Sequence, residues 1–132
     1  MRYVRPSTSC ARQYNENENS LKVLLNNIIL FGNYVAINLF GLVLSRRPLS
    51  KVERNHEYIH TLQQRELLWV GFYLWYLIEW LVRLIQTFKF STFKFSTKRA
   101  YYTISFEREA YAHQRDLDYR HHRPFWAWRK LL

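Results

Sequence analysis

Hydrophobic residues dominate residues 21–44, LKVLLNNIILFGNYVAINLFGLVL, and the pair Gly32 and Asn33 lies in the middle of this segment. Glycine supplies a positive φ and asparagine tolerates one, so this pair between two apolar runs indicates a hairpin turn. The segment is also long enough for one membrane span. Burying its four asparagines in lipid would be costly, and we therefore predict two or three short strands.

The hydrophobic pattern changes after SRRPLS at residues 45–50. Ser50 and Glu53 have the spacing of a capping box, in which each side chain binds a free backbone N–H at the start of a helix. We therefore predict a helix that begins at Ser50. This helix carries His56 and His60 in its second and third turns.

Residues 67–85, LLWVGFYLWYLIEWLVRLI, continue this helix as a strongly hydrophobic stretch. Glu79 and Arg83 are one helical turn apart and can pair, which lowers the cost of burying either one. Because the stretch contains no proline and only Gly71 as a weak break, we predict one continuous helix. It is either the core helix of a globular protein or a helix embedded in a membrane.

The remaining segments are shorter. Residues 88–97, FKFSTFKFST, repeat five residues in tandem, a period that fits neither helix nor strand and predicts a connecting loop. A last helix is predicted to begin near Ser105, and Pro124 limits its far end. Residues 1–20 have no hydrophobic signal segment and are predicted to form a mobile arm. Residues 21–132 are then one α+β domain, with a β-hairpin or small sheet followed by two or three long helices.

Composition and charge narrow the kinds of partner. Twenty Lys and Arg against ten Asp and Glu give a net charge of +10, which attracts anionic membranes or nucleic acids. No recognised nucleic-acid motif accompanies the basic aromatic segments, so no specific nucleic-acid partner is expected. The only cysteine, Cys10, excludes an internal disulfide framework and a cysteine-based zinc site. A metal would have to be bound by His and carboxylate groups.

The segment NHEYIH at residues 55–60 has the pattern of a zinc site. His56 and His60 are four residues apart, so on a helix they point the same way and can bind one cation. Glu57 is rotated by about 100° from His56, so it is placed to act as general base on a metal-bound water rather than as a ligand. Such a site needs a third protein ligand from another element, with the fourth position left to water.

Two carboxylate positions can supply the third ligand. Glu79 follows His60 at a spacing that resembles the aminopeptidase-type zincins, but a continuous helix would place it about 28 Å away along the axis. Glu107, in SFEREAY, lies on a separate predicted helix, and Ala110 on the same face would allow the two helices to approach closely. Glu107 is therefore the predicted third ligand, and Glu109 is the reserve.

Other polar residues near these motifs have weaker predicted roles. Tyr111 lies four residues after Glu107 and is predicted to stabilise an oxyanion during catalysis. His113 can fill the same role but is more often an ordinary surface histidine. Gln64 and Asn55 are interpreted as helix residues that make structural hydrogen bonds.

Together, HEYIH and the later EREA resemble the zincin metallopeptidases with a Glu third ligand, especially the membrane-embedded group of CAAX-type prenyl proteases and the heat-shock membrane protease. They also resemble small uncharacterised bacterial proteins that carry both motifs. The resemblance covers residues 50–113. It implies that Zn²⁺ is bound by His56, His60 and Glu107. It also implies that Glu57 activates water.

The resemblance therefore implies a peptidase that acts on a peptide or protein substrate at the cytoplasmic membrane of a bacterium. Tyr111 stands where these proteases have Asp. The alternative is a non-catalytic, basic, membrane-associated binding module with a structural zinc or no metal.

Overall fold

The computed structural model describes residues 22–25, 35–88 and 94–132. The chain divides into two compact units, with the boundary between Pro48 and Leu49. One unit contains a small sheet and the other contains the helices, which confirms the predicted α+β fold. The predicted arm at residues 1–20 lies outside the described residues.

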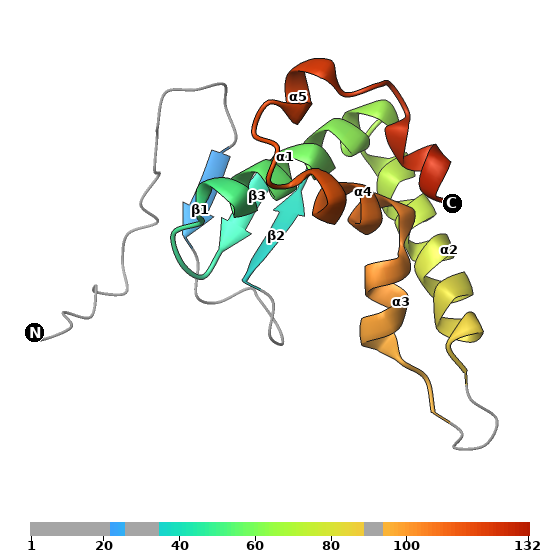
Figure 1. Cartoon of the computed structure of the whole chain (residues 1–132). Helices are drawn as coiled ribbons and strands as arrows, with labels where there is room; N and C mark the ends of the chain where they lie inside the picture. Colours follow the sequence, from blue (N-terminus) through green and yellow to red (C-terminus); the bar gives the residue numbers. More distant parts are fainter. Residues whose placement is uncertain (1–21, 26–34, 89–93) are drawn as a thin grey trace, which may run out of the picture. The chain divides into compact units, whose positions relative to one another are not determined.

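In chain order the elements are β1 (Lys22–Leu25), β2 (Ala36–Leu39), β3 (Leu42–Ser45), α1 (Lys51–Glu66), α2 (Val70–Gln86), α3 (Thr97–Thr103), α4 (Ser105–His113), α5 (Tyr119–His122) and the 3₁₀ helix η1 (Ala127–Leu131) (Figure 1).

The sheet has the order β1-β3-β2, with β1 parallel and β2 antiparallel to β3. The turn between β2 and β3 is formed by Phe40 and Gly41, which have φ values of 52° and 77°. Gly41 adopts a positive φ without steric cost because it has no Cβ atom. Gly32 and Asn33 lie outside the described residues. The hairpin predicted at this pair therefore stays a prediction. Of the described strands, β1 and β2 each pair with β3 and not with each other.

The start of α1 confirms the predicted capping box. The Ser50 hydroxyl accepts a hydrogen bond from the Glu53 backbone N–H at 3.2 Å, and the Glu53 carboxylate accepts one from the Ser50 N–H at 2.8 Å. These two bonds satisfy donors that the first turn of a helix leaves free. The sequence therefore fixes where α1 begins, and with it the face that carries His56 and His60.

The prediction of one continuous helix is wrong. The chain turns sharply after α1, and α1 and α2 meet at an angle of 107°. Leu68 and Trp69 have φ values of 51° and 64°, which ends the helical hydrogen-bonding pattern without glycine or proline. The turn lets Phe72 pack on Phe106, with ring centroids 4.6 Å apart. Burial of these rings in the core outweighs local helix propensity.

Two buried clusters place α4 at the centre of the helical unit. Phe106 belongs to one cluster, which α2 and η1 complete through Phe72 and Trp128. Ala110 belongs to the other cluster, which α1 and α5 complete. The predicted start of this last helix at Ser105 is confirmed. Because α4 packs between these elements, its carboxylates are held against α1.

Glu79 binds the start of α4 instead of a metal. Its carboxylate accepts hydrogen bonds from the Ser105 N–H at 2.8 Å and the Ser105 hydroxyl at 2.6 Å. Arg83 also donates to it at 3.3 Å. A carboxylate at this position satisfies free N–H groups and complements the positive end of the helix dipole. The helix break invalidates the 28 Å separation, yet Glu79 is still outside the histidine cluster.

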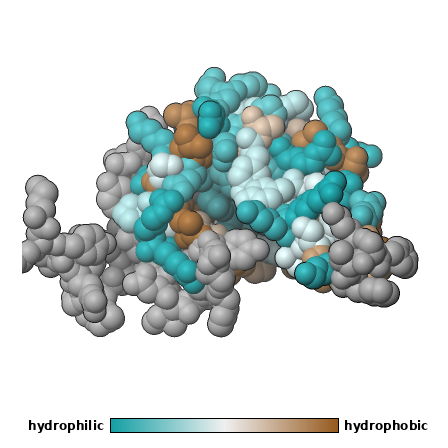
Figure 2. Space-filling view, turned by 60° about the horizontal axis from the view of Figure 1, so that its bottom comes forward, coloured by the Kyte–Doolittle hydropathy of each residue, from teal (hydrophilic) through white to brown (hydrophobic). Residues whose placement is uncertain are grey.

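Of the described helices, no single one is both long and hydrophobic enough to cross a membrane. Helices α1 and α2 together reach that length and hydrophobicity, but the chain bends between them. On the face drawn in Figure 2, hydrophilic side chains predominate and hydrophobic ones form separate small groups. Residues 89–93 of the loop predicted at residues 88–97 lie outside the described residues, and α3 begins at the last position of the loop.

Candidate metal centre

Three side chains from two helices converge in the helical unit. His56 and His60 come from α1 and Glu107 comes from α4, and one potential ligand atom from each lies within 4.8 Å of the others. The Nε2 atoms of the two histidines are 3.1 Å apart, and each lies 3.5 Å from a Glu107 oxygen. All three residues are buried, with 8%, 7% and 3% of their surfaces exposed. This group can hold a metal ion.

Gln63 fixes the tautomer of His60. The Gln63 amide nitrogen donates to the Phe106 carbonyl at 3.1 Å and to the Glu109 carboxylate at 3.0 Å. Both partners can only accept, so the amide oxygen of Gln63 faces the Nδ1 of His60, at 2.8 Å. This Nδ1 therefore carries the proton, and the Nε2 of neutral His60 presents its lone pair to His56 and Glu107.

The same arrangement holds at His56, whose Nδ1 lies 3.2 Å from the amide oxygen of Gln114. Two imidazole lone pairs and a carboxylate therefore face one another. The Oε2 atom of Glu107 is buried and has no hydrogen-bond partner among the described residues. The two lone pairs and the carboxylate repel one another unless a cation lies between them. The cluster therefore needs either a proton or a metal ion.

The electrostatics of the site show how a proton is held when no metal is bound. Burial by itself lowers the pKa of His60, but the Glu107 carboxylate beside it raises the pKa to about 9. Burial raises the pKa of Glu107, but the charge of His60 and the close approach of both imidazoles lower it well below the usual range. The metal-free site is therefore a buried imidazolium–carboxylate pair at neutral pH.

Zinc affinity is expected to rise with pH, by about tenfold per pH unit up to about pH 9, because the ion displaces one proton from His60. The pKa of His60 is raised on folding, so in the metal-free protein the proton stabilises the fold fully below pH 6.5, and this contribution is lost as the pH rises to about 9. Competition with a chromophoric chelator across this range measures the affinity. An affinity independent of pH would exclude displacement of this proton.

Glu57 lies close enough to the cluster to interact electrostatically with all three members, but it is not one of the converging groups. Its pKa is raised chiefly by burial, and the charges of His60 and His56 oppose this effect. A carboxylate with a raised pKa is a better proton acceptor at neutral pH than an ordinary one. The role of Glu57 as general base stays a prediction.

Tyr111 packs beside the cluster, with its ring centroid 4.6 Å from that of His56. Burial and the nearby Glu107 raise the pKa of Tyr111 to about 12, so its hydroxyl remains a hydrogen-bond donor at neutral pH. The His113 imidazole instead stacks on Tyr119, with centroids 3.8 Å apart, and is not part of the cluster.

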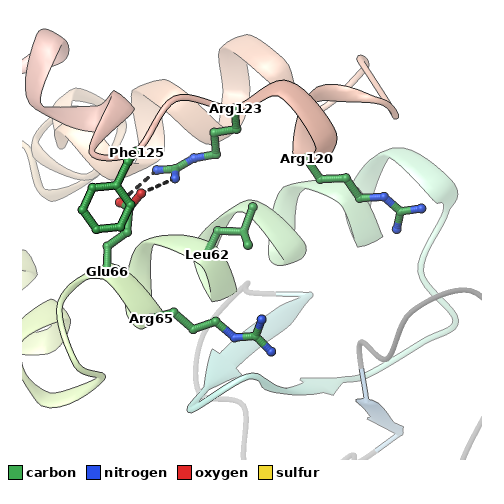
Figure 3. A pocket seen from close by; sticks show the side chains of 6 residues that line it. All are labelled: Leu62, Arg65, Glu66, Arg120, Arg123 and Phe125. Atoms are coloured by element: carbon green, nitrogen blue, oxygen red, sulfur yellow. Dashed lines mark hydrogen bonds and ion pairs between the residues drawn. The ribbon is translucent and has the colours of Figure 1, made fainter.

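Glu109, the reserve ligand, binds other partners. It accepts hydrogen bonds from Gln63 and from the Tyr119 hydroxyl, the latter at 3.1 Å, and it forms an ion pair with Arg123. Arg123 also pairs with Glu66, whose carboxylate it approaches in Figure 3. A continuous chain of hydrogen bonds therefore runs from Arg123 through Glu109 and Gln63 to His60.

Sequence reasoning missed these supporting residues. Gln63 lies three residues after His60, and a spacing of three on a helix was a usable signal for a partner of the imidazole. Tyr76 donates a hydrogen bond to the Glu107 Oε1 at 3.0 Å, and nothing local marks it. Asn55 makes the structural hydrogen bonds expected of it, to three carbonyl groups around the end of α4.

Gln63→Leu is expected to weaken zinc binding by about 10- to 100-fold, because His60 loses the acceptor that fixes its tautomer and ring orientation. The matched control is Gln86→Leu, which removes an exposed glutamine of α2. Chelator competition measures both affinities, and circular dichroism checks that both variants fold. Equal zinc affinity in the wild type and Gln63→Leu would show that this hydrogen bond does not orient the ligand.

Comparison with known proteins does not assign the chain to a family. No protein-family model, curated protein or solved structure matches the chain. The zincin resemblance thus stays a prediction from the two sequence motifs.

Proposed function

We propose that the protein is a membrane-associated, zinc-dependent hydrolase of the metallopeptidase type. The observation that carries this proposal is the convergence of two imidazole lone pairs on a buried carboxylate, with Glu57 beside them. Imidazole and carboxylate are donors that suit zinc, and three protein ligands are the number found in catalytic zinc sites. His56, His60 and Glu107 are the residues that would hold the ion.

The supporting hydrogen bonds also fit a metal site. In metal sites, the ring nitrogen of histidine that does not bind the ion usually donates to an oxygen acceptor, which orients the imidazole. Gln63 and Gln114 supply that oxygen for His60 and His56. The ligands are therefore orientated before any ion binds.

In the proposed reaction, bound zinc supplies Lewis-acid activation of water and of the peptide carbonyl. The Glu57 carboxylate accepts a proton from the attacking water and transfers it to the nitrogen of the leaving amine. The Tyr111 hydroxyl donates a hydrogen bond to the carbonyl oxygen as negative charge develops there. The proton balance closes, because the proton taken from water leaves with the amine.

A non-catalytic zinc site in a basic, membrane-associated binding module is the second candidate. The burial of all three ligands favours it, since structural metal sites are closed to solvent. Peptide hydrolysis by the full chain, with and without added zinc, separates the two candidates. Hydrolysis that a chelator stops and zinc restores supports the enzyme, and a zinc-loaded protein without any hydrolysis supports the structural site.

A further inference from the structure

Helix α2 carries a row of exposed aliphatic side chains along its whole length. Their positions recur every three or four residues, so they lie on one face of the helix. Their exposed fractions range from 44% at Leu81 to 70% at Ile85. We call the six residues the apolar row: Val70, Leu74, Leu77, Ile78, Leu81 and Ile85.

The opposite side of α2 is packed against its own unit. Phe72 is buried against Phe106, and Tyr76 donates a hydrogen bond to Glu107. The two charged residues of the helix, Glu79 and Arg83, pair with each other, and Glu79 is buried. The apolar row therefore offers no charge or hydrogen-bonding side chain over a length of about 22 Å. Whatever covers it must be apolar.

Cations border the far end of α2. The Ser96 N–H donates to the Thr87 hydroxyl at 3.2 Å, which brings the start of α3 beside the end of α2. Helices α2 and α3 then run side by side (Figure 1). Three basic residues are exposed at this end, Lys94, Lys98 and Arg99.

Cations also border the near end. Trp75 of α2 contacts Trp128 of η1, with ring centroids 5.8 Å apart. Arg129 and Lys130, the next residues of η1, are exposed. The sequence contains no Asp or Glu in residues 80–106 or 119–132, so few carboxylates oppose these five cations. Exposed cations therefore stand at both elements that contact α2 at these points, three on or just before α3 and two on η1.

We propose that α2 binds the surface of an anionic lipid bilayer, with its axis in the plane of the membrane. The apolar row enters the acyl region, and the five bordering cations lie among the anionic headgroups. Trp75, which is 39% exposed, lies between the two regions, where indole rings are favoured. This inference does not depend on zinc or on hydrolysis, because none of these residues belongs to the metal centre.

Two other occupants of the apolar row are less compatible with its charge and chemistry. A second copy of the chain would bring two positively charged borders together, which electrostatic repulsion disfavours. A nucleic acid would satisfy the cations but would leave the aliphatic row exposed to water. An anionic bilayer satisfies both the row and its borders.

Sedimentation of the full chain with vesicles tests the proposal. We expect the chain to bind vesicles of phosphatidylglycerol and phosphatidylcholine, and to bind pure phosphatidylcholine at least about tenfold more weakly. Lys98→Glu with Lys130→Glu should remove this preference for anionic lipid. Equal binding to both vesicle types would overturn the electrostatic part of the proposal.

The apolar row is tested separately by Leu77→Glu with Leu81→Glu. These changes should weaken vesicle binding by at least about tenfold, because two carboxylates would enter the acyl region. The matched control is Leu117→Glu, which alters an exposed leucine in the segment between α4 and α5. Unchanged binding by the double variant would overturn the proposal. So would absence of vesicle binding together with a dimer that the double variant dissociates in sedimentation velocity.

Discussion

Glu57→Gln is expected to lower the rate of peptide hydrolysis by about 100- to 10,000-fold, the usual contribution of a general base. Glutamine has nearly the same size as glutamate but cannot accept the proton from water. Because Glu57 is not one of the three converging groups, the variant should retain its zinc. The measurements are kcat on a quenched fluorescent peptide and zinc content by elemental analysis.

Glu53→Gln is the matched control for this variant. It makes the same chemical change one helical turn earlier on α1, and glutamine at this position still completes a capping box. Its kcat should equal that of the wild type. Full activity of Glu57→Gln would exclude Glu57 as the base, and loss of zinc from this variant would show that Glu57 holds the ion.

Arg123→Met is expected to destabilise the protein by about 3–5 kcal/mol, because removing one partner of a buried ion pair leaves the other charges uncompensated. The side chain of Arg123 is 4% exposed, and it pairs with Glu66 and Glu109, which are 5% and 1% exposed. Glu109 also holds Gln63 in place, so zinc affinity should fall with stability. Urea denaturation followed by circular dichroism measures the free energy of unfolding.

Arg115→Met is the control for Arg123→Met, since Arg115 is exposed. Its free energy of unfolding should stay within about 0.5 kcal/mol of the wild type. Equal unfolding free energies for Arg123→Met and Arg115→Met would show that the buried network contributes no net stability. In that case the chain of contacts from Arg123 to His60 would not be a support for the metal centre.

Local features of the helical unit could be predicted from the sequence. The capping box at Ser50 and the start of α4 at Ser105 depend on residues within one turn of each other. The shared face of His56 and His60 follows from helix geometry alone. Glu107 was preferred to Glu109 as the third ligand because the small Ala110 lies on the same helix face as Glu107. The structure places Ala110 in a buried cluster with residues of α1 and α5.

Features that depend on distant contacts could not be predicted. The turn at Leu68 and Trp69 contains no glycine or proline, and packing of Phe72 accompanies it. The parallel pairing of β1 with β3 joins strands that are separated in the chain, and no local signal specifies it. Arg123 reaches Glu66 across 57 positions of sequence, so the hydrogen bonds that support the candidate metal centre became visible only in the structure.

Metal content of the purified full chain tests the central claim most directly. The wild type, Glu107→Gln and Glu109→Gln would be reconstituted with zinc, desalted and analysed for all transition metals. We expect one zinc per chain in the wild type and in Glu109→Gln, and almost none in Glu107→Gln, because Glu107 faces both histidines whereas Glu109 pairs with Arg123. No zinc in the wild type, or a full equivalent of zinc in Glu107→Gln, would contradict the proposed metal centre.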